Sequence, residues 1–560
     1  MNIVLTNANI YTANSKMPWA NTLVIDGERI AYVGDNDKAR WEKSVGIKPK
    51  IFNMNGKMII PGFIDSHTHS GMTSASSWHI RLPLTQEVDE LLAFVKKYAE
   101  EHPASEVPFL YFEYYSTSLF DEKGPRKELL DTAVSDRPCL MQDQIGHQDW
   151  INSKMLEYLG VDKDTPDPSE LEMFVRDADG EPTGCVNEWA WLSFIDNLYK
   201  RVNWTPPAMT PELLEPFFTF LADNGITAMA DGGDGITPEE QARSISQLDK
   251  KGKLNTCFDG VVRFWDVNDL PEKIAQVKEW QKKYGSKHIK FNTLKFFLDG
   301  TNESGRCSLL EPFVNDPTGK NYGTLAMEES DLIKCLILCN QAGLDIHIHV
   351  VGDGTFRTAC NAYEKAKKQA TEDWKMQMLL LHCELVHPSD MHRPAELGIT
   401  VNWSPHWSGG YFGEQSKIFL GEERWNRMYQ FNPIIDSGAL VTFSGDITRI
   451  VRLHRANPFL GIQVAHTRVD PEFPLDPERF PGSMRPPESA KLSREVLMKG
   501  YTINGAKQMH WDDCMGSIEV GKLANLNVLS DNVFEVAADK IKDIKFEAVM
   551  FEGKVLRGQL

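Results

Sequence analysis

Two histidines separated by one residue, His67 and His69, end an apolar run that contains Pro61 and Gly62. In an extended strand, residues two apart point to the same side, so both imidazoles can reach one metal ion. The chain holds 15 histidines, and such a pair could equally lie solvated on a loop. The motif therefore predicts a metal site only if further ligands follow along the chain.

Three later apolar runs also end in residue types that bind metals. They are His349 after residues 344–348, His382 after residues 378–381, and Asp446 after residues 439–445. Each has an ordinary alternative, because a strand-end histidine is often hydrogen-bonded in the core and Asp446 could cap a helix. Taken one at a time, these residues leave both explanations open.

The elements that would position these residues alternate between short apolar segments and helical patterns, the order expected for parallel strands joined by helices. Eight segments are the strand candidates: Phe63–Asp65, Pro138–Gln142, Ile226–Ala230, Ile289–Leu298, Leu344–Val350, Met378–Leu381, Ile399–Trp403 and Leu440–Phe443. Residues 109–115 and 257–264 compete for the same places. The count predicts an α/β fold with a (β/α)8 TIM-like barrel, whose active site lies at the C-terminal ends of the strands.

The rest of the chain predicts two additions to a barrel over residues 61–509. Residues 1–60 and 510–560 both alternate apolar and polar residues over short runs, and we expect them to form one small β-sandwich domain together. Residues from about 78 to 204 are too many for an ordinary βα loop, so they predict an inserted lobe. The lobe contains a clear helix pattern over Thr85–Glu101.

Composition narrows the class of partner. Asp and Glu number 79 against 60 Lys and Arg, a net charge of −19, so we expect no nucleic-acid or membrane partner and a small-molecule substrate. No apolar run approaches about 18 residues and the N-terminus does not resemble a signal peptide, which predicts a cytoplasmic protein. Nine scattered cysteines predict neither a disulfide framework nor a zinc ribbon. A homo-oligomer is expected, with a dimer as the first guess.

The segment Pro61–Asp65 and the order of candidate ligands resemble the amidohydrolase superfamily of metal-dependent (β/α)8-barrel hydrolases. Nearly the whole chain resembles amidohydrolase family 3, the branch that includes N-substituted formamide deformylases. The motifs that carry this likeness are Pro61–His69, Arg137-Pro138 with Gly146-His147 and Asn152-Ser153, Pro182-Thr183-Gly184 with Glu188, Lys295 with Asp299-Gly300-Thr301, His349–Asp353, His382 and Gly516–Leu523. The resemblance implies a metal-binding set of His67, His69, Lys295, His349, His382 and Asp446.

Lys295 lies in an apolar segment where a free ammonium group is costly. Its ordinary explanations are an ion pair with Asp299 or a stem that reaches solvent. The likeness to binuclear members of the superfamily implies instead that carbon dioxide carboxylates Lys295, making an anion that bridges two metal ions. Lys290 lies in the same segment and leaves the assignment open.

Two departures from the branch concern the pocket. The usual Gly-Ser-Asp at the last strand is Ser444-Gly445-Asp446 here, and the usual Val-Thr-Arg is His466-Thr467-Arg468, which could add a histidine near the pocket. These changes leave substrate preference open.

The predicted chemistry is hydrolysis of a non-peptide C–N bond, an N-formyl or N-acyl amide among the options. One or two divalent metal ions, with zinc as the first choice, would lower the pKa of water from about 15.7 to near 7. Asp446 would accept the proton of the attacking water, His147 would help to hold the carbonyl oxygen, and Trp78 would line an apolar pocket. His147 could instead anchor the lobe, and Trp78 could serve packing.

Two other activities compete with amide hydrolysis. The same metal site could support ester or lactone hydrolysis or an isomerisation. The chain could also be a catalytically inactive scaffold of the same fold, although the complete set of candidate ligands argues against this.

Overall fold

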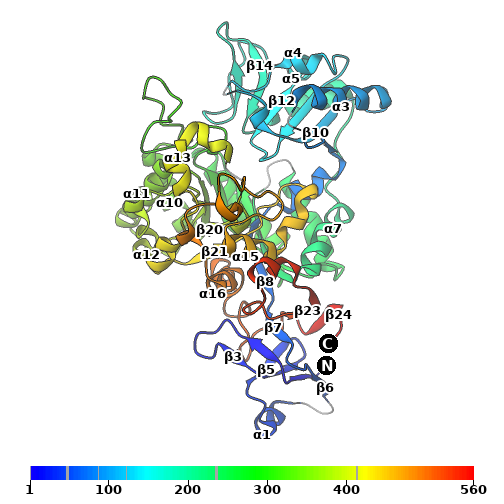
Figure 1. The fold of residues 1–560 in the computed structure, drawn as a ribbon, viewed down its shortest axis with the longest axis vertical. Helices are drawn as coiled ribbons and strands as arrows, with labels where there is room; N and C mark the ends of the chain where they lie inside the picture. The colour runs from blue at the N-terminus through cyan, green and yellow to red at the C-terminus, as the bar shows by residue number, and fades with distance from the viewer. Residues whose placement is uncertain (1, 46–48, 86, 122, 234–236, 411–413) are drawn as a thin grey trace.

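The computed structural model describes residues 2–560 except 46–48, 86, 122, 234–236 and 411–413. Three parts follow one another along its long axis (Figure 1). A lobe lies at the top of the view, a barrel in the middle, and small sheets that contain both chain termini at the bottom.

Eight parallel strands form the central barrel, in the order β21-β20-β19-β18-β17-β16-β15-β8. They are β8 (Phe63–Thr68), β15 (Ile226–Asp231), β16 (Cys257–Arg263), β17 (Ile289–Phe297), β18 (Asp345–Val350), β19 (Met378–His382), β20 (Thr400–Trp403) and β21 (Val441–Phe443). The chain after β21 returns to β8, where the N–H of Asp446 donates to the carbonyl of His67 at 3.0 Å. The prediction of a (β/α)8 barrel is confirmed.

One of the eight strand assignments was wrong. Residues of Pro138–Gln142 belong to β11 (Cys139–Asp143), which pairs with β10 (Leu110–Tyr115) in the lobe. The competing run 257–264 supplies barrel strand β16. Both runs are apolar and short, and periodicity alone does not distinguish two buried strands of different sheets.

Helices cover the barrel, and local sequence signals determine where they begin and end. In α7 (Pro211–Asp223), the side chain of Thr210 accepts a hydrogen bond from the N–H of Leu213, which caps the first turn. In α10 (Glu329–Ala342), Gly343 ends the helix with a φ of 64°, a left-handed conformation that glycine adopts without a Cβ clash. Cys335 and Cys339 lie buried in α10, as core residues, and all nine cysteines are free.

Both chain ends contribute to the small sheets at the bottom of Figure 1. One sheet has the order β5-β4-β1-β6, formed by β5 (Arg29–Gly34), β4 (Thr22–Asp26), β1 (Asn2–Thr6) and β6 (Lys50–Asn53). The other has the order β24-β23-β22-β7-β2-β3, and its outer strands are β24 (Lys554–Gly558), β23 (Phe546–Phe551), β2 (Asn9–Tyr11) and β3 (Trp19–Ala20). In the second, β7 (Met58–Pro61) pairs antiparallel with β22 (Leu526–Leu529), so residues from the two ends share one sheet. Strand β7 leads directly into barrel strand β8.

The lobe contains a six-stranded sheet in the order β13-β14-β12-β11-β10-β9, whose edge strands are β13 (Met173–Arg176) and β9 (Ile80–Arg81). Its helix α3 (Val88–Glu101) is the one expected over Thr85–Glu101. His147 directly precedes β12 (Gln148–Ile151), and Glu188 directly follows β14 (Pro182–Asn187). Among the described helices, none has the length and apolar character needed to cross a bilayer.

Candidate metal centre

The predicted ligands gather at one cavity at the C-terminal ends of the barrel strands. Its lining includes every member of the predicted set: His67, His69, Lys295, His349, His382 and Asp446. The cavity volume is about 90 Å³, enough for small groups only. The barrel therefore brings together residues from four strands, β8, β17, β18 and β19, and from the segments that follow β8 and β21.

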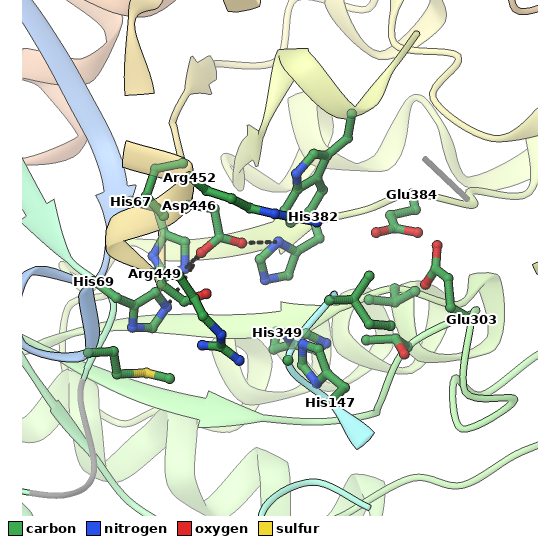
Figure 2. Close-up of a pocket in the computed structure, with 18 of the residues that line it drawn as sticks. His67, His69, His147, Glu303, His349, His382, Glu384, Asp446, Arg449 and Arg452 are labelled. Carbon is green, nitrogen blue, oxygen red and sulfur yellow. Dashed lines mark ion pairs between the residues drawn. The ribbon is translucent and has the colours of Figure 1, made fainter. Parts of the chain in front are cut away.

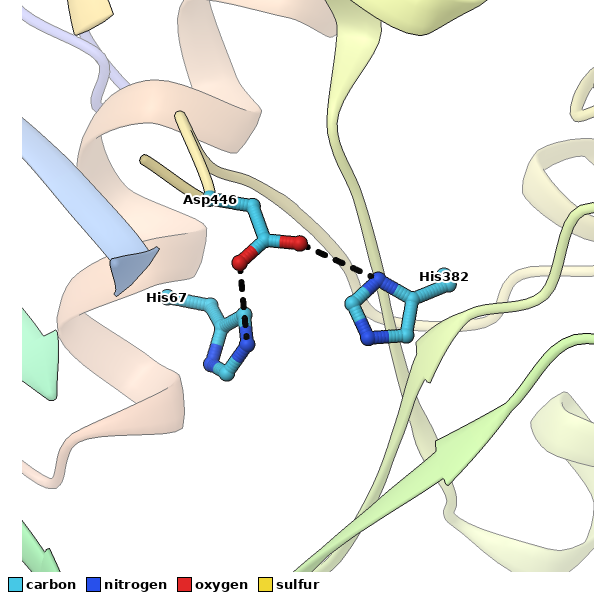
Figure 3. A group of neighbouring side chains, drawn as sticks. All are labelled: His67, His382 and Asp446. Carbon is cyan, nitrogen blue, oxygen red and sulfur yellow. Dashed lines mark ion pairs between the residues drawn. The ribbon is translucent and has the colours of Figure 1, made fainter. Parts of the chain in front are cut away.

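Asp446 lies at the centre of the histidine group. Its Oδ1 lies 3.5 Å from Nε2 of His67 and 3.4 Å from Nε2 of His69, and its Oδ2 lies 3.5 Å from Nδ1 of His382. Figure 3 shows the carboxylate between His67 and His382. One ligand atom from each of these three residues lies within 4.8 Å of the others, an arrangement that could hold a metal ion.

His349 and Lys295 complete the wall of the cavity. The ring of His349 lies 4.4 Å from the ring of His382, and neither of its nitrogens has a hydrogen-bond partner in the described chain. The Nζ of Lys295 is likewise buried without one. Buried polar atoms are rarely left unpaired, so these donors fit a metal or another bound group.

Asp65 ties the first and last strands together behind this site. Its Oδ1 accepts from the N–H of His67 at 3.3 Å and from the N–H of Gly445 at 3.0 Å. Gly445 is tightly placed, because a Cβ there would lie 2.9 Å from the Asp65 carboxylate. Asp65 thus holds the backbone directly before Asp446 beside the first strand.

Electrostatics suit metal ligands. Burial lowers the pKa of His382 to about 3 and those of His67 and His349 well below 6.5, so the imidazoles are neutral with lone pairs available. Burial alone would raise the pKa of Asp446, but the surrounding imidazoles hold it well below its usual range. A carboxylate and neutral imidazoles together form a donor set that binds divalent metals.

Backbone strain also concentrates here. Asp446 has a φ of 45°, His382 a φ of 71° and Cys383 a φ of 41°, all in the left-handed region. Residues other than glycine rarely adopt this backbone conformation. It recurs at functional sites, where the surrounding structure imposes it.

Neither ordinary explanation of Lys295 applies. Asp299 accepts hydrogen bonds from the backbone of Ser308, Val351 and Gly352 and from the hydroxyl of Thr355 instead. Lys295 is fully buried, so its stem does not reach solvent. Burial lowers the pKa of Lys295 to about 7, which leaves a substantial fraction of the amine neutral.

His147 reaches the same cavity from the lobe, where Figure 2 shows it near His349. Its Nδ1 lies 2.7 Å from Oε2 of Glu188. Burial disfavours the charged form of His147 and by itself would lower its pKa. The charge and hydrogen bond of Glu188 have the larger combined effect and raise the pKa of His147 to about 9. The structure thus places the His147 ring 5.9 Å from the ring of His349, with its Nδ1 held by the Glu188 carboxylate.

Two of the residues singled out in the sequence lie outside the metal cavity. Trp78 ends a short turn over Ser76–Trp78 and lines a second, adjoining cavity. His466 lies in α15 (Pro458–Thr467), where its Nδ1 lies 2.8 Å from the carbonyl of Leu492, and it lines neither cavity. The expectation of an extra histidine near the pocket was therefore wrong, because the helix directs it toward a neighbouring loop.

Several cavity residues were missed by the sequence analysis: Glu303, Glu384, His406 and Arg449. Glu303 and Glu384 lie together, apart from the histidine group (Figure 2). Burial, and then the charge of Glu303, raise the pKa of Glu384 well above its ordinary value. Glu384 follows His382 by two residues and Arg449 follows Asp446 by three, so proximity to a strand-end ligand was the available signal.

Comparisons with known proteins agree with this geometry. The sequence profile of the amidohydrolase family matches residues 50–557. The exoenzymes regulatory protein AepA of Pectobacterium carotovorum is 26% identical over 453 residues, which cover 80% of this chain and 94% of that protein. The N-substituted formamide deformylase of Arthrobacter pascens is 24% identical over 570 residues, covering 99% and 98%.

The solved structures show the same fold. An uncharacterized metal-dependent hydrolase from Pyrococcus horikoshii superposes with a TM-score of 0.69 at 21% identity, covering 96% of this chain and 99% of that one. Since the profile spans most of the chain, the protein belongs to the amidohydrolase family and is a hydrolase by that membership.

Proposed function

We propose that this protein is a metal-dependent amidohydrolase that cleaves a non-peptide C–N bond of a small-molecule amide. One observation carries the proposal: Asp446 lies 3.4 to 3.5 Å from three histidines at the mouth of the barrel. The deformylase relative supports the choice of bond, because its name describes an enzyme acting on N-substituted formamides.

The residues that would hold the metal are His67, His69, Lys295, His349, His382 and Asp446. The donor set suits one or two divalent ions, and zinc is the first choice because histidine and carboxylate ligands are common at zinc sites. When bound, such an ion supplies a Lewis acid that lowers the pKa of water to near 7.

Asp446 acts as the proton carrier. Its carboxylate is ionised and faces the cavity, so it can accept a proton from the attacking water and return it to the leaving nitrogen. The contact with Glu188 keeps the imidazole of His147 protonated. Its ring can therefore donate a hydrogen bond to the carbonyl oxygen of the substrate as negative charge develops there.

Lys295 is the group we propose for carboxylation. Its neutral amine nitrogen would bond to the carbon of carbon dioxide and release one proton, giving a carbamate anion. The buried Nζ without a hydrogen-bond partner supports this step, because the carbamate oxygens would replace an unsatisfied amine with metal-binding groups.

The test combines metal content with a substrate panel. Protein purified without chelator is analysed by plasma mass spectrometry and assayed on formamides, acetamides and matched esters, beside the His67→Ala variant. Metal in the parent, its loss in the variant and hydrolysis of amides in preference to esters would support the proposal. Metal with ester hydrolysis alone would overturn the choice of bond, and neither metal nor turnover after reconstitution would favour a scaffold.

A further inference from the structure

A second cavity of about 290 Å³ adjoins the metal centre, and we call it the aromatic chamber. Its walls include Trp78, Tyr111, Trp189, Trp191, Tyr199 and Trp265. Five residues line both the chamber and the metal cavity: His69, Met72, Trp189, Phe297 and Arg449. A substrate held at the metal centre can therefore extend one substituent into the chamber.

Two of the aromatic side chains in the chamber pair their polar atoms with neighbouring side chains, so their rings present apolar surface. The hydroxyl of Tyr111 donates to Gln142 at 2.9 Å, and the indole N–H of Trp191 donates to Asp149 at 2.6 Å. Trp78 and Tyr111 meet edge to face, with centroids 5.6 Å apart. Such walls suit another aromatic ring, because edge-to-face contacts add to the gain from burial alone.

The charged side chains of the chamber are also paired. Arg263 lies 3.6 Å from Glu172, and its guanidinium stacks 3.7 Å above the ring of Trp265. Arg449 lies 3.3 Å from Glu113 and donates to Gln142. The chamber thus favours a neutral group over an ionised one.

Trp189 connects the two cavities and has an unusual backbone. It and Glu188, the partner of His147, are consecutive residues with φ of 60° and 51°. Its indole Nε1 is buried without a hydrogen-bond partner in the described chain. Strain of this kind persists where the fold must hold particular side chains, here the partner of His147 and the wall residue that both cavities share.

Cavity size completes the argument. An apolar cavity of roughly 150 Å³ holds a benzene ring, so a chamber of about 290 Å³ holds a ring with its linker. The metal cavity, at about 90 Å³, admits only a small group beside the reacting bond. From these observations we propose that the substrate is an amide whose one large substituent is a neutral aromatic ring, bound in the aromatic chamber.

This inference rests on the proposed function, so its test includes a measurement that needs no turnover. Binding of benzyl alcohol and of cyclohexylmethanol to the metal-loaded protein is followed by saturation-transfer NMR. Activity is compared between N-benzylformamide and N-(cyclohexylmethyl)formamide and between phenylacetamide and cyclohexylacetamide, which place the ring on either side of the amide.

Two variants alter the chamber without emptying the core. Trp265→Ala removes a wall residue that is 44% exposed, and its control is Trp19→Ala, 43% exposed in the terminal sheets. Ala75→Phe fills the chamber from the last residue of α2 (Ser70–Ala75). Its control is Ala342→Phe, at the last residue of α10 and outside both cavities.

We expect kcat/KM to favour the aromatic amides by about tenfold, as contacts between rings support. Trp265→Ala should raise KM with kcat nearly unchanged, and Ala75→Phe should abolish both the preference and benzyl alcohol binding, while the controls change neither. Equal kcat/KM for both kinds of amide, or benzyl alcohol binding that survives Ala75→Phe, would overturn the inference. If Ala75→Phe abolishes benzyl alcohol binding but the parent hydrolyses none of the amides, the chamber stands as a binding site for an aromatic ring and the proposed function is overturned.

Discussion

The backbone N–H of Asp446 donates to the carbonyl oxygen of His67 at 3.0 Å, and the side chains of the same two residues approach to 3.5 Å. The hydrogen bond joins the chain after the last barrel strand to the first strand. Closure of the barrel and assembly of the candidate metal centre are therefore one structural event. A change that loosens this junction will also displace the carboxylate from the histidines.

Replacing Asp446 with Asn keeps the size of the side chain and removes its charge and basicity. We expect kcat to fall by about 10²- to 10⁴-fold, the usual contribution of a general acid–base group, with the melting temperature nearly unchanged. Asp353→Asn is the control, a buried aspartate in the first turn of α11 (Asp353–Gln369) outside both cavities. Wild-type turnover by Asp446→Asn would remove this residue from its proposed role.

Removing the metal should destabilise the protein, because an ion that binds only the folded chain stabilises it. We expect a chelator to lower the melting temperature of the parent and to leave that of His67→Ala almost unchanged. The control is His392→Ala, whose side chain is 55% exposed. If neither chelator nor added zinc changes the melting temperature of the parent, the result would contradict a metal at this site.

Lys295→Met tests the buried amine. An apolar side chain of similar length removes an unpaired polar group, so the metal-free variant should be more stable than metal-free parent by about 1–3 kcal/mol in urea unfolding. Turnover should be lost. Lys290→Met, in the same strand, removes a lysine whose Nζ donates to the carbonyl of His510 at 2.9 Å and should not be stabilising.

Native mass spectrometry examines carboxylation of Lys295 directly. The parent should show the added mass of one carbon dioxide molecule in bicarbonate buffer, and Lys295→Met should not. An adduct retained in Lys295→Met would place the modification on another lysine.

His147 and Glu188 should act as one unit, since their side chains meet at 2.7 Å. We expect Glu188→Gln and His147→Gln each to lower kcat, and the double variant to lose no more than His147→Gln alone. Additive losses in this cycle would mean that Glu188 has a separate role, for example in holding the lobe.

His288 should make stability depend on pH far from the candidate site. Hydrogen bonding to Glu552, at 3.1 Å, and then to Asp249 raises the pKa of His288 above its ordinary 6.5. Because the folded pKa is the higher one, this stabilisation is fully present below pH 6.5 and is lost as pH rises through the folded value.

The measurement is urea unfolding of the parent and His288→Gln across pH values from about 6 upward. The difference in unfolding free energy between the two proteins should shrink as pH rises. A difference that stays constant over this range would show that the imidazole charge does not contribute.

The amino-acid sequence by itself determined the barrel class and the types and order of the candidate ligands. Those features are local: an apolar run marks a buried strand, and a histidine or aspartate at its end marks the place where parallel strands present their side chains. His67, His349, His382 and Asp446 were all recognisable in this way, and the cavity contains each of them.

Only the tertiary structure decided which apolar runs belong to the barrel and which residues reach its mouth. The run 138–142 and the run 257–264 look alike locally, and pairing with distant strands assigned the first to the lobe and the second to the barrel. Glu303, from a loop, lines the same cavity as Glu384. The lobe places Trp189 in the wall that the two cavities share. Contacts of this kind depend on the packing of segments far apart in the chain, which hydrophobic periodicity does not encode.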